Sequence, residues 1–177
     1  MRSIRDESGT TIIEVVIASA ILVTLMAGLM SLAGLAISTT ENQGHLGART
    51  TEYAQDKMEQ LLALTYADAS SDTRVFPATN SGGSGLAVAG SSNPGAPVAL
   101  YVDYLDQNGN LCGSSGAECI APVGTTPPTN WFYQRVWQVE EPEANLKRIT
   151  VTATIARGFG GAMRASSTLS VLKARGF

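Results

Sequence analysis

The most distinctive pattern in the chain is one long apolar run near its N-terminus. Residues 12–37 are almost continuously apolar, and Glu14 is the only strongly polar residue among them. As a helix with a rise of about 1.5 Å per residue, this run would be about 39 Å long, which exceeds the ~30 Å hydrocarbon core of a bilayer. The pattern therefore predicts a helix that can span a membrane.

Helical spacing of apolar residues continues beyond this run. The positions that recur about every 3.6 residues, as on one face of a helix, are Leu46, Tyr53, Met58, Leu61, Leu62 and Thr65. No proline interrupts the chain before Phe76. We therefore predict one helix over about residues 10–66, whose outer half packs on a globular part.

The opposite face of the same outer half is mostly acidic. It carries Arg49, Glu52, Asp56 and Glu59. Two interpretations remain open: a face in contact with solvent, or a contact with a basic neighbouring subunit.

The pattern changes after the predicted helix. Residues 67–97 are rich in Ser, Gly, Asn, Ala and Pro, which is typical of a long loop. Strand signals follow, and we predict four strands at residues 98–105, 131–140, 147–157 and 163–173. With one half-buried face on the helix, they would form a roughly four-stranded antiparallel sheet, so the expected fold class is α+β. The aromatic residues expected at the helix–sheet interface are Trp131, Phe132, Tyr133 and Trp137.

Composition and charge exclude several functions. The 177 residues are 44% hydrophobic with a net charge of -3, which lacks the basic footprint of nucleic-acid binding. There is one histidine, His45, and there are two cysteines, and no catalytic or metal-ligand motif occurs. We therefore expect a protein that is not an enzyme and that has no cofactor and no metal site.

Basic residues predict the orientation of the membrane helix. Arg2 and Arg5 precede the apolar run, and the next basic residue is Arg49. The N-terminus should therefore face the cytoplasm, with residues 38–177 outside the inner membrane.

Two short sequence features in the part of the chain outside the membrane predict local structure. Cys112 and Cys119 would lie in an oxidising compartment, where we expect a disulfide, with a free or metal-bound pair as the alternative. Residues 106–110 begin like an oxygen-rich calcium loop but lack its later glycine and glutamate. Since Asn108-Gly109 is a strong hairpin signal, we expect a turn there, with a calcium site as the alternative.

The N-terminal region resembles the prepilin signature of type IV pilin-like proteins. The residues that carry the resemblance are a short charged leader ending in Gly9, a junction before the apolar run, and Glu14. The resemblance implies cleavage of residues 1–9 between Gly9 and Thr10 by a prepilin peptidase, and N-methylation of Thr10. It also implies a type IV pilin fold. The family most often has Phe at the position occupied here by Thr10.

The physical role of Glu14 follows from this cleavage. A cut after Gly9 creates an α-amino group with a reference pKa of ~7.7–8. In a filament, the resemblance implies that Glu14 meets the amine of a neighbouring subunit. An unpaired carboxylate in an apolar bundle is costly, so this pairing would disfavour wrong axial registers.

Two further stretches resemble PilV-type minor pilins. They are residues 54–66, and residues 137–139 together with 146–151. The resemblance implies a subunit that helps to initiate assembly of a type IV pilus and lies at or near its tip. Its partners would be other minor pilins, the major pilin, the inner-membrane assembly platform, the prepilin peptidase, and membrane lipid before assembly.

Two alternatives remain open. The same stretches are similar to minor pseudopilins of type II secretion, and loss of twitching or loss of secretion on deletion would separate the two systems. The other alternative is a signal-anchored periplasmic binding or enzyme domain. It predicts an uncut leader and activity of the isolated residues 40–177.

Overall fold

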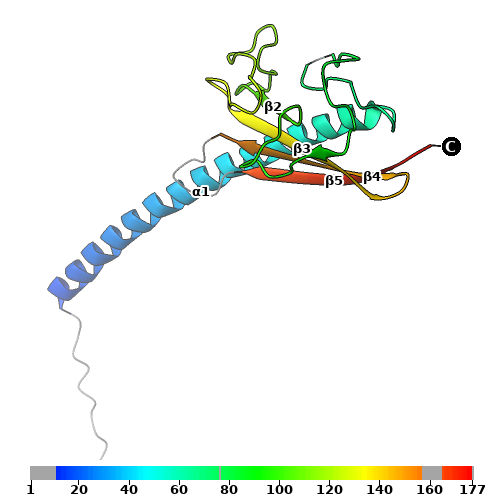
Figure 1. Ribbon diagram of the computed structural model, residues 1–177. Coiled ribbons are helices and arrows are strands. Elements are labelled where there is room, and N and C mark those ends of the chain that lie inside the picture. Colours follow the sequence, from blue (N-terminus) through cyan, green and yellow to red (C-terminus); the bar gives the residue numbers. More distant parts are fainter. Residues whose placement is uncertain (1–10, 76, 157–164, 177) are drawn as a thin grey trace, which may run out of the picture. The chain divides into compact units, whose positions relative to one another are not determined.

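The computed structural model describes residues 11–75, 77–156 and 165–176, except for the side chains of residues 39, 42 and 43. One helix, α1 (Ile12–Ala63), is followed by an antiparallel sheet, so the predicted α+β class is confirmed (Figure 1). The chain divides into two compact units, residues 1–43 and 44–177. The first contains the apolar part of α1, and the second contains the outer part of α1 and the sheet.

The sheet has five strands rather than the predicted four. They are β1 (Ala89–Gly90), β2 (Val102–Leu105), β3 (Tyr133–Glu143), β4 (Leu146–Ile155) and β5 (Ser166–Ala174). Their order is β1-β3-β4-β5, and β2 also pairs with β3. The additional strand β1 has two residues and lies in the segment that we predicted as a loop, so it carried no strand signal.

Only a glycine fits at the end of β1. Gly90 has φ +91°, and a Cβ atom there would lie 2.3 Å from the carbonyl oxygen of Trp137. The missing side chain therefore allows β1 to approach β3 closely.

One face of the sheet packs on the outer part of α1. The helix contributes Tyr53, Ala54, Met58 and Leu61, all buried. Tyr53 meets Tyr133 of β3 edge to face, with ring centroids 4.7 Å apart. The alternation predicted for β4 is confirmed, since its odd-numbered residues from Ile149 to Ile155 are buried in this core.

The predicted apolar face was wrong in part. Leu62 is 36% exposed, and Thr65 is also exposed because the helix ends at Ala63. Two polar residues of the helix that were not predicted to be buried, Thr50 and Lys57, are instead fully buried.

The prediction that Trp131 lies at the helix–sheet interface was also wrong. It packs with Val102, Tyr104 and Val136 in a second cluster that includes both cysteines. These positions on β2 and β3 alternate with those that face α1, so Trp131 belongs to the opposite face of the sheet. Tyr133 and Trp137 are buried against the helix as predicted, and Phe132 packs there half-buried.

Two lysines from the sheet reach the C-terminal end of α1 and the turn after it. Lys173 of β5 donates to the Leu62 carbonyl oxygen at 2.6 Å. Lys147 of β4 donates to the carbonyl oxygens of Tyr66 and Leu86, at 2.8 and 2.7 Å. The last turn of α1 contains no basic residue of its own. These ammonium groups therefore supply the positive charge that a helix C-terminus favours, and they attach the following loop to the sheet.

A buried charge cluster joins α1 to two strands. Asp103 of β2 accepts from Arg135 of β3 at 2.7 and 2.9 Å, and its Oδ2 lies 2.6 Å from the Lys57 Nζ of α1. Lys57 is fully buried and the Asp103 side chain is 1% exposed. Lys57 also donates to the Thr73 carbonyl oxygen and lies over the ring of Trp137.

The cluster contains two cations and one carboxylate. Burial alone would raise the pKa of Asp103, but Arg135 and Lys57 outweigh it and hold that pKa below its usual value. Burial lowers the pKa of Lys57 to about 8, although Asp103 opposes the shift. Lys57 therefore loses its proton more readily than an exposed lysine does. Asp103 is the group that compensates the buried positive charge of the cluster.

We expect Asp103→Asn to lower the free energy of unfolding by about 3–5 kcal/mol, because it leaves two buried cations without an anion. Lys57→Met should cost clearly less, since it retains the Arg135–Asp103 pair and fills a similar volume. Urea unfolding of the detergent-solubilised chain, followed by tryptophan fluorescence, measures both. Equal losses would contradict the central role of Asp103.

Candidate membrane and assembly site

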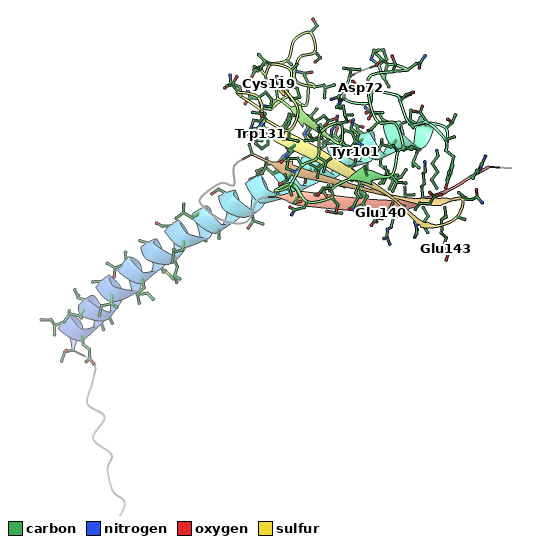
Figure 2. The ribbon with its side chains drawn as sticks, in the orientation of Figure 1. Asp72, Tyr101, Cys119, Trp131, Glu140 and Glu143 are labelled. Atoms are coloured by element: carbon green, nitrogen blue, oxygen red, sulfur yellow. A yellow bond between two sulfur atoms is a disulfide. The ribbon has the colours of Figure 1, made fainter. Side chains whose placement is uncertain are left out.

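The apolar part of α1 is exposed along its whole length. Residues 12–38 form a stretch of 27 residues with mean hydropathy 2.4, long and apolar enough to cross a membrane. Its large apolar side chains are between 53% (Met26) and 85% (Ile12) exposed, and they project freely from the ribbon (Figure 2). None of the described residues of the first compact unit covers this surface. An apolar surface of this size requires lipid or another protein chain around it.

The hydroxyl groups of this segment are satisfied by the helix itself. Ser19, Thr24, Ser31 and Ser38 each donate to a carbonyl oxygen three or four residues earlier, at 2.8–3.1 Å. Such intrahelical bonds let a hydroxyl enter an apolar environment at low cost. Glu14 differs, because its carboxylate has no hydrogen bond or ion pair with any residue that the structure describes.

The position of Glu14 in the first turn of α1 provides a local explanation for an acid. The Thr11 carbonyl oxygen accepts from the backbone N–H of Glu14 at 3.0 Å, and Thr11-x-x-Glu14 has the spacing of a capping box. Sequence reasoning did not consider this spacing, and the structure shows only the backbone bond between the two residues, without the side-chain bonds of a capping box. A carboxylate near a helix N-terminus gains about 0.3–1 kcal/mol from the helix dipole.

This gain is smaller than the cost of the charge in lipid. A carboxylate at mid-bilayer costs up to ~2.5–3.5 kcal/mol on insertion scales, and less near an interface. The helix dipole offsets only part of that cost. A cation from outside the described residues is therefore the partner that Glu14 needs once the segment is surrounded by apolar groups.

The predicted processing residues lie outside the described part of the chain. Gly9 and Thr10 are among the residues for which no structure is given, so cleavage and N-methylation at this junction remain predictions.

The predicted disulfide is present in the second unit. Cys112 and Cys119 are bonded, with Cα atoms 4.9 Å apart, and both are buried. Figure 2 places Cys119 and Trp131 in the same region of this unit. The disulfide closes a short loop against the outer face of β2 and β3.

The Asp106 region forms the predicted turn. The fully buried Asp106 carboxylate accepts from the backbone N–H groups of Asn108, Asn110 and Glu118 at 2.8–3.1 Å. Burial would raise the pKa of Asp106, but these bonds and one from the Asn110 amide outweigh it and lower that pKa. Both carboxylate oxygens are therefore used to tie the turn to the disulfide loop. Gly109 completes the turn with φ +87°, where a Cβ atom would meet the Tyr53 hydroxyl.

Among the residues with a described structure, no three His, Cys, Asp or Glu side chains are grouped as a metal site would require. A scan against protein-family models found no match, and searches of curated proteins and of solved structures found none either. A function must therefore be inferred from the exposed helix segment, its carboxylate Glu14 and the folded unit that follows it.

Removing the disulfide should lower the free energy of unfolding by about 2.5 kcal/mol, because an open loop restores chain entropy to the unfolded state. The double variant Cys112→Ser/Cys119→Ser would be compared with Ser115→Ala in the same loop by urea unfolding. Non-reducing peptide mapping provides the direct check, and two free thiols on the exported chain would contradict the assignment.

Proposed function

We propose that this chain is a type IV pilin-like structural subunit, stored in the bacterial inner membrane and assembled into a filament through the apolar part of α1. The observation that carries the proposal is the exposed apolar segment with one carboxylate in its first turn that has no partner among the described residues. Lipid covers such a surface before assembly, and equivalent helices of other subunits cover it in a filament. This subunit has no enzymatic role.

The carboxylate gives the proposal its chemistry. Cleavage between Gly9 and Thr10 removes the charged leader and leaves an ammonium group at the start of the helix. In a stack of parallel helices, the Glu14 carboxylate of one subunit neutralises the amine of the next. Wrong axial registers leave both charges unpaired in an apolar environment, so they are disfavoured.

The second unit supplies the surface of the filament. Its core between α1 and the sheet, its buried ion cluster and its disulfide suit a domain exposed outside the cell. The N-terminus would face the cytoplasm, and residues 38–177 would lie in the periplasm before assembly and on the cell surface afterwards.

Within this class, we propose a minor pilin that helps to initiate assembly and lies at or near the filament tip. Residues 54–66 and 137–139 support this subgroup by their resemblance to PilV-type sequences. Its partners would be other minor pilins, the major pilin and the assembly platform. Deletion of the gene separates a type IV pilus from type II secretion, since the first predicts loss of twitching and the second predicts loss of secretion.

Substitution of Glu14 tests the assembly role. Glu14→Leu should leave membrane insertion intact, because it makes the segment more apolar. It should reduce recovery of the subunit in sheared filaments or pilin complexes by about tenfold or more, as expected for loss of one buried ion pair. Glu14→Gln keeps the shape without the charge and should show a similar defect. Quantitative immunoblots of membrane and filament fractions measure both.

Thr24→Leu is the matched control in the same segment, because its hydroxyl bonds only to the helix backbone. It should assemble like the unmodified chain. Normal incorporation of Glu14→Leu would contradict the pairing, and equal defects in all three variants would indicate a general effect of the helix surface.

A further inference from the structure

The second unit uses its described cations internally. Every Lys and Arg that the structure describes there donates a hydrogen bond within the chain. The residues are Arg49, Lys57, Arg74, Arg135, Lys147, Arg148, Lys173 and Arg175. None of these groups bonds to Asp56 or Glu59.

Asp56 and Glu59 are the carboxylates that this arrangement leaves without an ion pair on the outer part of α1, in the second unit. Both are exposed and three residues apart on one face of the helix, and neither takes part in a salt bridge among the described residues. Like charges at this spacing repel each other. A cation from outside the chain would relieve that repulsion.

A cleft of about 690 Å³ lies beside these two carboxylates. Asp56, Glu59 and Gln60 of α1 line one part of it, while Leu111 of the disulfide loop and Arg135 of β3 line others. The cleft lies entirely within the second compact unit.

Two polar groups in the cleft match a peptide backbone. The Gln60 Oε1 is buried and has no hydrogen-bond partner in the structure. The Arg135 side chain is 5% exposed, and it binds Asp103 through Nε and Nη2, which leaves Nη1 outside that pair. The Gln60 Oε1 has almost no accessible surface, so a ligand N–H reaches it only if the side chain turns toward the cleft, and this turn would be favoured because a buried acceptor without a partner is costly.

A second cleft extends the first. This second cleft of about 340 Å³ shares Val75, Leu111 and Ser114 with the first and continues to the disulfide loop. Val75 is 40% exposed and provides an apolar wall. The two clefts together therefore offer carboxylates, one acceptor, an apolar strip and two guanidinium groups, of Arg135 and of Arg74, which is paired with Asp72.

We propose that this groove binds an extended, lysine- or arginine-bearing segment of a neighbouring filament subunit. The basic side chain pairs with Asp56 and Glu59, a backbone N–H donates to Gln60, and the apolar flanks lie against Val75 and Leu111. The assignment to a neighbouring subunit rests on the proposed function, whereas the groove's preference for basic peptides does not.

Peptide titration of the full-length chain in detergent micelles tests the groove. The probe is an acetylated and amidated pentapeptide, GVKVG, with a norleucine analogue in place of lysine as the uncharged control. We expect the lysine peptide to bind, and the double variant Asp56→Asn/Glu59→Gln to weaken it by about tenfold, as loss of two partly exposed ion pairs predicts. Glu143→Gln removes an exposed carboxylate outside the groove and should leave binding unchanged.

Three results of this titration would overturn the proposal. They are no binding of the lysine peptide, equal binding of the norleucine peptide, and equal weakening by Glu143→Gln, which would indicate non-specific charge attraction. Unfolding curves of each variant verify that the fold is retained.

A second measurement in cells tests the identity of the occupant. Asp56→Lys/Glu59→Lys should reduce incorporation into filaments while leader cleavage stays normal. Normal incorporation would overturn the assignment to a neighbouring subunit. An uncut leader in the unmodified chain would instead overturn the proposed function, and the peptide titration would still decide whether the groove binds basic segments.

Discussion

The proposed function depends on one constraint, the Glu14 carboxylate in an exposed apolar helix surface. The described residues of its compact unit neither pair with this carboxylate nor cover the surface. The hydroxyls of the segment donate to the helix backbone, whereas the Glu14 carboxylate has no hydrogen bond or ion pair with any described residue. The helix dipole offsets only part of the cost of its charge in an apolar environment. On the proposed function, another chain supplies both an apolar surface and a positive charge to this segment.

A second electrostatic constraint organises the folded unit. Asp103 holds Lys57 of α1 and Arg135 of β3 together in a nearly dry interior, so helix and sheet are joined by charge as well as by apolar contact. Lys147 and Lys173 then attach the end of the helix to the outer strands. Because the described cations are used internally, Asp56 and Glu59 have no ion pair among the described residues, and the groove that we propose to bind a basic segment lies beside them.

Much of this architecture could be predicted from hydrophobic periodicity. The helix, the four longer strands, the Asn108-Gly109 turn and the disulfide were all expected. Long-range electrostatics could not be predicted, because Lys57 has the helical spacing of the buried face, four residues from Tyr53 and from Leu61, but the spacing does not reveal which acid pairs with it. Only the pairing of β2 with β3 brings Asp103 within reach of it. Trp131 was misplaced for a related reason, since an aromatic residue next to a strand does not reveal which face of the sheet it covers.

The mass of the N-terminal peptide of the chain recovered from membranes and filaments tests the central claim most directly. The account predicts a peptide that begins at Thr10, with or without one methyl group, on a chain that retains the apolar helix. A mature chain that still carries residues 1–9, or one that has lost the helix, would contradict it.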